Sequence, residues 1–120
     1  MTDSAYFLDT YALAKFNTGD TAYKPYENVD GILTIFNLAE LNWSFKRDNK
    51  LAADKLTRHY AANQVPVLVE DIISAMNLRL QNKKLSIPDV IGYIVAQRHG
   101  IKFLTGDKEF EGMKNVEFVK

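Results

Sequence analysis

The sequence contains no cysteine, no long apolar run and no net charge. Without cysteine, it has neither a disulfide framework nor a thiolate metal site. No apolar stretch approaches the roughly 18 residues of a membrane-spanning helix, and no signal peptide is visible, so we expect a cytoplasmic protein without membrane contact. Fifteen acidic and fifteen basic residues balance one another, which excludes a general attraction to nucleic acid and leaves only local basic patches.

Length and composition indicate one folded domain over residues 1–120. A hydrophobic content of 47% is typical of a globular protein and argues against disorder. We find no internal repeat, no linker and no low-complexity tract. A chain of this length is long enough to bury a hydrophobic core.

The apolar pattern predicts strands alternating with helices. Strands are expected at 5–8, 31–34, 102–105 and 116–119, and helices at 11–16, 35–47, 49–62, 70–81 and from residue 86 onward. Residues 21–28 are expected to form a short helix or an irregular segment, and 65–69 an extended segment. This alternation predicts an α/β fold, a three-layer sandwich with a mainly parallel central sheet flanked by helices.

Residues 85–110 carry the clearest local signals. Ser86 is a good N-cap, Asp89 follows three residues later, and Pro88 suits the first helical turn. Gly100 is a natural residue for the helix end. A short apolar strand follows and is broken by Gly106, so the segment ends in a Thr-Gly-Asp loop.

Four acidic residues differ from the rest, which look like surface charge. Asp9 ends the first predicted strand, Glu40 lies in an apolar helix, Asp89 opens the central helix, and Asp107 follows the central strand. Ligand sites in open parallel sheets form beyond the carboxyl ends of the strands. Four clustered carboxylates stay ionised only beside a cation, and an all-oxygen site suits Mg²⁺ or Mn²⁺. Such metals activate water and bind phosphates in phosphodiester cleavage.

Each acid also has an ordinary structural interpretation. Asp9 and Asp89 are suitable helix caps, and Asp107 is a common turn residue after Gly106. Glu40 is costly to bury unpaired, although it would be unremarkable on an exposed stripe. Only the order and spacing of the four acids, taken together, favour a metal-binding site.

Basic residues near the Glu40 helix are candidates for contacts with RNA phosphates. We single out Lys46 and Arg47, which lie two helical turns from Glu40. The alternative is a solvated helix face with alternating charge.

His59 and His99 are isolated in the sequence, and we expect neither of them to bind a metal.

The motifs YFLDTYAL, TIFNLAELNW and SIPDVIGYIVAQRHGIKFLTGDKEF together resemble the PIN domain, a family of Mg²⁺- or Mn²⁺-dependent ribonucleases. The resemblance covers nearly the whole chain. Among PIN domains, small chains of this kind are similar to the VapC-type toxins of toxin–antitoxin pairs. The resemblance therefore implies RNA cleavage, an antitoxin protein as partner, and a homodimer.

The resemblance also implies roles for individual residues. Its acidic quartet, both catalytic and metal-binding, corresponds to Asp9, Glu40, Asp89 and Asp107. Thr105 matches a small hydroxyl residue near the last acid, and Asn37 is a plausible polar neighbour one turn before Glu40. One departure is the pair Gly92 and Tyr93, where small residues are usual, and we expect it to loosen the helix or narrow the pocket mouth.

Three other functions compete with a metal-dependent endoribonuclease. A non-catalytic PIN-like module that binds RNA or protein has no need for four clustered acids. A phospho-acceptor receiver domain requires adjacent acids after the first strand, whereas Asp9 is followed by Thr10 and Tyr11. The D-x-D pattern of a phosphatase is also missing, because Tyr11 occupies its second acidic position.

Overall fold

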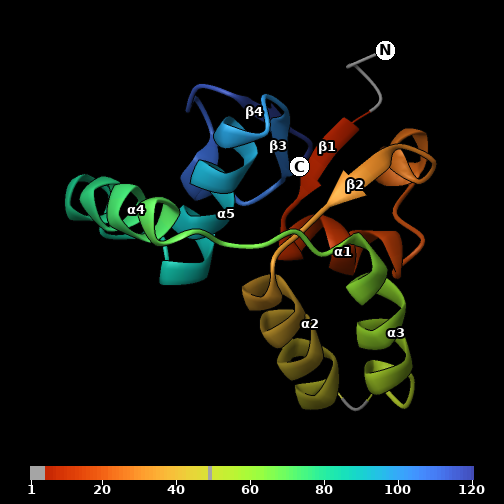
Figure 1. The fold of residues 1–120 in the computed structure, drawn as a ribbon. Coiled ribbons are helices and arrows are strands. Elements are labelled where there is room, and N and C mark those ends of the chain that lie inside the picture. The colour runs from red at the N-terminus through yellow and green to blue at the C-terminus, as the bar shows by residue number, and fades with distance from the viewer. Residues whose placement is uncertain (1–4, 49) are drawn as a thin grey trace.

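A parallel sheet lies at the centre of the fold (Figure 1). The computed structural model describes residues 5–48 and 50–120. Within them, four strands pair in the order β2-β1-β3-β4, and every neighbouring pair is parallel. These strands are β1 (Ala5–Leu8), β2 (Asp30–Ile32), β3 (Lys102–Thr105) and β4 (Val116–Phe118). The predicted parallel α/β architecture is confirmed.

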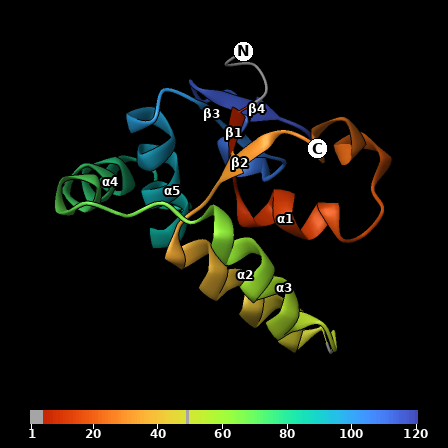
Figure 2. The ribbon, with the colours of Figure 1, turned by 45° about the vertical axis from the view of Figure 1, so that its right-hand side comes forward.

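Helices cover both faces of this sheet (Figures 1 and 2). The α-helices are α1 (Thr10–Phe16), α2 (Ile35–Arg47), α3 (Ala53–Tyr60), α4 (Val69–Gln81) and α5 (Ile87–Arg98). Three short 3₁₀ helices are η2 (Thr21–Tyr26), η3 (Ala61–Asn63) and η4 (Lys108–Phe110) within the described ranges. α2 and α3 pack as a pair that extends away from the sheet, and α4 packs on α5.

Two hydrophobic cores follow from the alternation of side chains along the strands, since successive residues point to opposite faces. Phe7 and Phe103 stack at a centroid distance of 5.4 Å and pack with Val90 and its neighbours on α5. Leu8 and Leu104 point the other way and join the core beneath α1 and α2. This arrangement gives the three expected layers.

The ends of α5 form as predicted. The backbone N–H of Asp89 donates to Ser86 Oγ at 3.2 Å, and the backbone N–H of Ser86 donates to Asp89 Oδ2 at 2.9 Å. This reciprocal capping satisfies donors that the first turn leaves unpaired. Gly100 ends the helix at a φ of 68°, a left-handed conformation that suits glycine.

Gly92 and Tyr93 face the core, which corrects our expectation of a loosened helix or a narrowed pocket mouth. α5 runs unbroken through both residues. A Cβ at Gly92 would lie 2.9 Å from the Phe7 ring and 3.2 Å from the Phe103 ring. Glycine therefore lets the helix approach the sheet closely, while the Tyr93 hydroxyl donates to the Lys114 carbonyl oxygen.

Two boundaries differ from prediction because side chains cap the next helix. The expected strand 31–34 ends at Ile32, since the side chain of Asn37 accepts the Thr34 N–H at 2.9 Å and starts α2 at Ile35. The expected extended segment 65–69 ends before Val69, the first residue of α4.

The segment 49–62 is less helical than predicted. α3 begins at Ala53, and a 3₁₀ turn replaces its last residues; Asn49 lies outside the described residues. Residues 21–28, predicted only as irregular or helical, contain the 3₁₀ helix η2 around Pro25.

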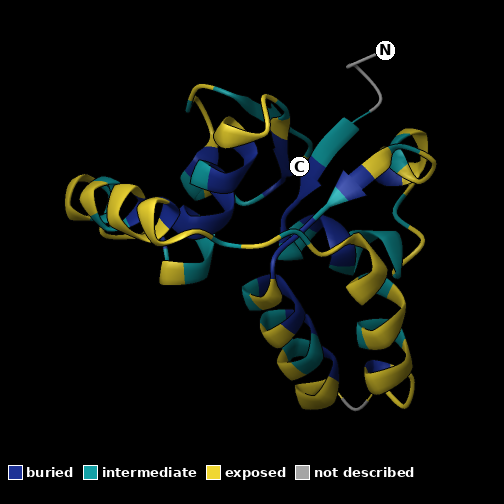
Figure 3. Cartoon of the chain, viewed as in Figure 1, coloured by how far each residue is buried: buried dark blue, intermediate teal, exposed yellow. Residues whose placement is uncertain are grey.

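The outward face of α4 is exposed and apolar (Figure 3). Val69, Ile73 and Leu80 are 71%, 51% and 72% exposed, and Met76 lies between them at helical spacing. We call these four residues the α4 stripe.

No helix in residues 5–48 or 50–120 has both the length and the apolar character needed to cross a membrane.

We predict that Gly106→Ala lowers the free energy of unfolding by about 1–3 kcal/mol, the usual cost of overpacking. A Cβ there would lie 2.2 Å from the Val119 carbonyl oxygen and 2.4 Å from the Tyr11 ring. Urea denaturation measures the change. Gly19→Ala is the comparison, because it meets no atom within 4 Å and carries only the strain of a φ of 76°. Equal losses in the two variants would contradict crowding at Gly106.

Candidate active site

The carboxyl ends of β1 and β3 lie side by side and carry two of the predicted acids. Leu8 pairs with Leu104 in the parallel register, and the Asp9 N–H donates to the Leu104 carbonyl oxygen at 3.2 Å. Asp9 directly follows β1, and Asp107 comes two residues after β3. The sheet therefore places both acids at one edge, as its parallel pairing requires.

Asp9 is the most buried member of the set, with 2% of its surface exposed. Its Oδ1 accepts the Thr10 N–H at 2.8 Å, which caps α1, and its Oδ2 accepts the Thr105 hydroxyl at 2.6 Å. Burial, followed by the charges of Asp89 and Glu40, raises the Asp9 pKa to about 8 despite these hydrogen bonds. The side chain therefore occupies a position where negative charge is poorly compensated.

Glu40 reaches the site from α2 through a polar network. The Thr10 hydroxyl donates to Glu40 Oε1 at 2.9 Å, and the Asn37 amide donates to the Thr10 hydroxyl oxygen at 3.3 Å. Asn37 is 1% exposed, and its carbonyl oxygen accepts the Thr34 hydroxyl at 2.9 Å. Burial first, and the Asp89 charge, raise the Glu40 pKa. Glu40 is thus held in place rather than lying on a solvated stripe.

Thr10 is a residue whose role at this site the sequence did not reveal. In the sequence it is notable only as a non-acidic residue after Asp9, whereas its hydroxyl joins Glu40 and Asn37 beside Asp9. A hydroxyl residue directly after a strand-ending acid is the signal that could have identified it.

Asp89 and Asp107 each combine a local structural contact with a place near the other acids. Asp89 caps α5, and burial first, then the Asp107 charge, raises its pKa. Asp107 Oδ1 accepts the Glu109 N–H at 3.0 Å, which starts η4. Its own N–H donates to Thr105 Oγ1 at 3.1 Å. The interpretation of Asp89 as a helix cap and of Asp107 as a turn residue is correct, but neither role removes the acid from the site.

Thr105 joins the first and last acids. Its hydroxyl donates to Asp9 while its oxygen accepts the Asp107 N–H. The residue is fully buried at the end of β3. These two hydrogen bonds fix the orientation of the Asp9 carboxylate and the path of the loop that carries Asp107.

Electrostatic interactions connect all four acids. Asp9 feels the charges of both Asp89 and Glu40, Glu40 feels Asp89, and Asp89 feels Asp107. In the part of the chain that the structure describes, no lysine or arginine forms an ion pair with any of the four. The cluster therefore combines one buried acid and three half-buried acids without a basic partner among the described residues.

The donor chemistry of the cluster fits a hard divalent cation. All of its groups are oxygen ligands, which Mg²⁺ and Mn²⁺ prefer. However, no group of three or more acidic or histidine side chains among residues 5–48 and 50–120 is already arranged to surround one ion. The fit therefore lies in charge and ligand type.

Lys46 and Arg47 lie on the last turn of α2, far along the helix from Glu40. Lys46 is six residues further on, about 9 Å along the axis. Its ammonium pairs with Asp54 at 3.0 Å, and Arg47 pairs with Asp48 at 3.4 Å. The structure thus places both at the outer end of the α2–α3 pair, where acids already neutralise them (Figure 1).

Comparisons with known proteins agree on the fold. The family model of the PIN domain matches residues 6–116. A solved structure described as a toxin–antitoxin complex from Klebsiella pneumoniae superimposes with a TM-score of 0.73, covering 93% of this chain and 95% of that chain at 21% identity. No curated protein sequence gives a significant match.

We predict that Asp9→Asn stabilises the metal-free protein progressively as pH rises. The folded state retains a proton on Asp9 that the unfolded chain releases between pH 3.8 and about 8. This stabilisation is complete below the lower pKa and is lost as pH rises through the upper one, by at most about 1.4 kcal/mol for each pH unit. An asparagine at position 9 does not titrate, so the variant lacks this dependence of stability on pH.

Urea denaturation in chelator across this pH range measures the difference between wild type and variant. Asp54→Asn is the control, because Asp54 is exposed and hydrogen bonds from Asn42 and Lys46 lower its pKa. A stability difference for Asp9→Asn that does not change with pH would show that Asp9 is ionised throughout.

Proposed function

Because the chain belongs to the PIN domain family, whose members are in general nucleases, we propose that it is a metal-dependent endoribonuclease that hydrolyses RNA phosphodiester bonds. We further propose that it is the toxin of a toxin–antitoxin pair acting in the cytoplasm. The observation that carries this proposal is Asp9, a buried carboxyl at the sheet edge whose pKa is raised by burial and by two neighbouring acids.

In the proposed mechanism, Asp9, Glu40, Asp89 and Asp107 would hold Mg²⁺ or Mn²⁺, and the bound ion would supply an activated water and offset charge on the phosphate. The chain itself orients these ligands. Thr105 fixes one oxygen of Asp9, and Thr10 fixes one oxygen of Glu40. Each carboxylate keeps its second oxygen, or a second lone pair, for the ion.

A protein nucleophile is not needed in this mechanism. The sequence has no cysteine, and His59, whose ring packs against Tyr60, has no acidic partner that would activate it among the described residues. The alternative function, a non-catalytic PIN-like module that binds RNA or protein, gives no reason to gather four acids around the buried Asp9.

We also propose an antitoxin protein as a partner. The support is the structural neighbour, which was solved as a toxin–antitoxin complex. Its similarity extends over nearly the whole of both chains. A co-expressed protein that blocks the proposed cleavage would identify this partner.

A second copy of the chain is the proposed occupant of the α4 stripe. Val69, Ile73, Met76 and Leu80 follow one another at intervals of four, three and four residues, the spacing of a helix–helix seam. Antiparallel pairing about a two-fold axis would set Val69 against Leu80 and Ile73 against Met76. The stripe is therefore complementary to itself, which supports the homodimer.

We predict that Asp107→Asn abolishes RNA cleavage, with a loss of at least roughly 100-fold, as expected for an electrostatic contact at a reacting centre. Cleavage of total RNA with Mn²⁺ is the measurement, and excess chelator should abolish wild-type activity. Glu111→Gln is the matched control, because Glu111 is exposed. Full activity in Asp107→Asn, or wild-type cleavage that survives chelator, would contradict the metal mechanism.

We predict that Ile73→Glu converts the dimer into monomers, because it places a charge in the centre of the α4 stripe. Light scattering at micromolar concentration measures the mass in solution. Trp43→Glu is the control, since Trp43 is 65% exposed on α2 and lies outside the stripe. A wild-type protein that is already monomeric would refute the homodimer.

A further inference from the structure

The turn between α4 and α5 presents two lysines without a counter-charge. Lys83 and Lys84 are exposed, and neither forms an ion pair with any residue of the described ranges. They contrast with Lys46 and Arg47, which pair with acids at the outer end of α2. A phosphate would therefore displace no existing partner at the turn.

The turn leads directly to the acidic site. A hollow of about 440 Å³ is lined by residues 80–85 and by Glu109. Glu109 follows Asp107 by two residues, so their Cα atoms are at most about 7 Å apart. On the other side, Lys84 is only two residues from Ser86, which caps the helix that carries Asp89. The hollow thus connects the lysines with the loop that carries Asp107 and with the start of the helix that carries Asp89.

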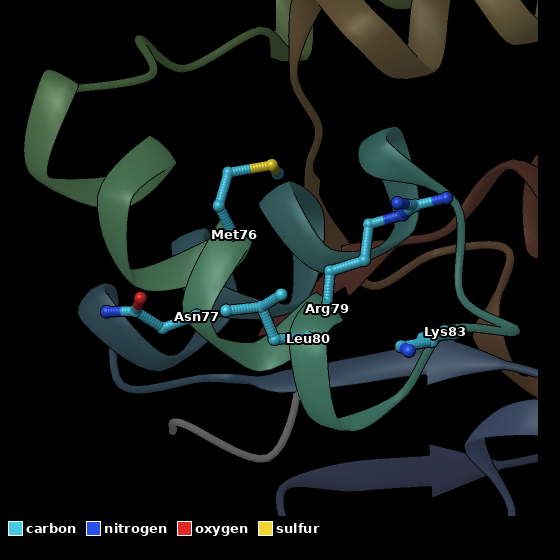
Figure 4. Close-up of a pocket in the computed structure, with 5 residues that line it drawn as sticks. All are labelled: Met76, Asn77, Arg79, Leu80 and Lys83. Atoms are coloured by element: carbon cyan, nitrogen blue, oxygen red, sulfur yellow. The ribbon is translucent and has the colours of Figure 1, made fainter.

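The backbone of the turn is held firmly in place. Arg79 Nε donates to the Leu85 carbonyl oxygen at 3.0 Å, and the Leu85 N–H donates to the Asn82 carbonyl oxygen at 3.1 Å. Leu85 is 1% exposed and anchors the turn in the core. Figure 4 shows Arg79 extending from α4 toward the start of α5, with Lys83 on the turn that follows α4. The two ammonium groups are thus displayed from a fixed position.

We propose that Lys83 and Lys84 bind phosphates of a single-stranded RNA on one side of the bond to be cleaved, so that the strand runs from the acidic site along this hollow. The inference rests on the proposed function, and it assigns the path of the substrate. Two unpaired cations on the same hollow give the polyanion favourable contacts beyond the acids. Glu109 lines the same hollow, and its negative charge opposes phosphate binding at the end of the hollow nearest to Asp107.

The test measures RNA binding without cleavage. All proteins carry Asp107→Asn, and a labelled single-stranded RNA of mixed sequence is titrated with Mg²⁺ at several salt concentrations. Each phosphate contact contributes about 0.7 to the slope of log Kd against log salt. The double variant Lys83→Gln with Lys84→Gln should reduce that slope by about 1.4. Glutamine keeps much of the side-chain length, so packing is preserved.

Lys46→Gln with Arg47→Gln is the matched control, and it should leave the slope unchanged. Glu109→Gln should tighten binding in the parent background. An unchanged slope in the Lys83 and Lys84 variant, with RNA still bound, would overturn the proposed path and leave the nuclease intact. A slope reduced only in the control would place the strand along α2 instead. A parent protein that binds no RNA would overturn the proposed function together with this inference.

Discussion

The parallel pairing of β1 with β3 is the constraint on which the rest of the site depends. Its register sets Leu8 beside Leu104, and this places Asp9 within hydrogen-bonding reach of Thr105. Shifting the register by one residue would reverse every side chain between the two cores, so the packing of Phe7 and Phe103 fixes the position of the acids. The hydrophobic cores thereby determine the geometry of a polar site.

Burial and mutual repulsion favour the protonated forms of the acids in the cluster. The pKa values of Asp9, Glu40 and Asp89 are all raised, with burial as the largest cause. Hydrogen bonds from Thr105, Thr10 and Ser86 act in the opposite direction. The same donors that stabilise the ionised carboxylates also orient them, so orientation and charge are set by the same contacts.

Much of the fold was predictable because local signals agree with the global arrangement. The capping of α5 by Ser86 and Asp89 and its end at Gly100 follow from short-range chemistry that a sequence displays. The boundary at Thr34 was missed, because an Asn37 side chain that starts a helix resembles any other polar residue in the sequence.

The candidate site was only partly accessible from the sequence. The placement of Asp9 and Asp107 at one edge follows from parallel pairing, which the alternation of strands and helices predicts. The bridging role of Thr10 and the close contact at Gly92 depend on distances between elements far apart in the chain. The periodicity of apolar residues along the sequence gives no information about such distances. The neutralisation of Lys46 likewise depends on Asp54, which comes from a neighbouring helix.

The hydrogen bond between Thr105 and Asp9 also bears on the order of events during synthesis. It joins residues 96 positions apart, so it forms only after the chain has been made as far as Thr105. Folding proceeds from the amino terminus as the chain emerges, and contacts of long sequence separation form late. A partly made chain consequently lacks β3, the loop of Asp107 and the partner of Asp9. The complete cluster arises only once the loop of Asp107 has been made.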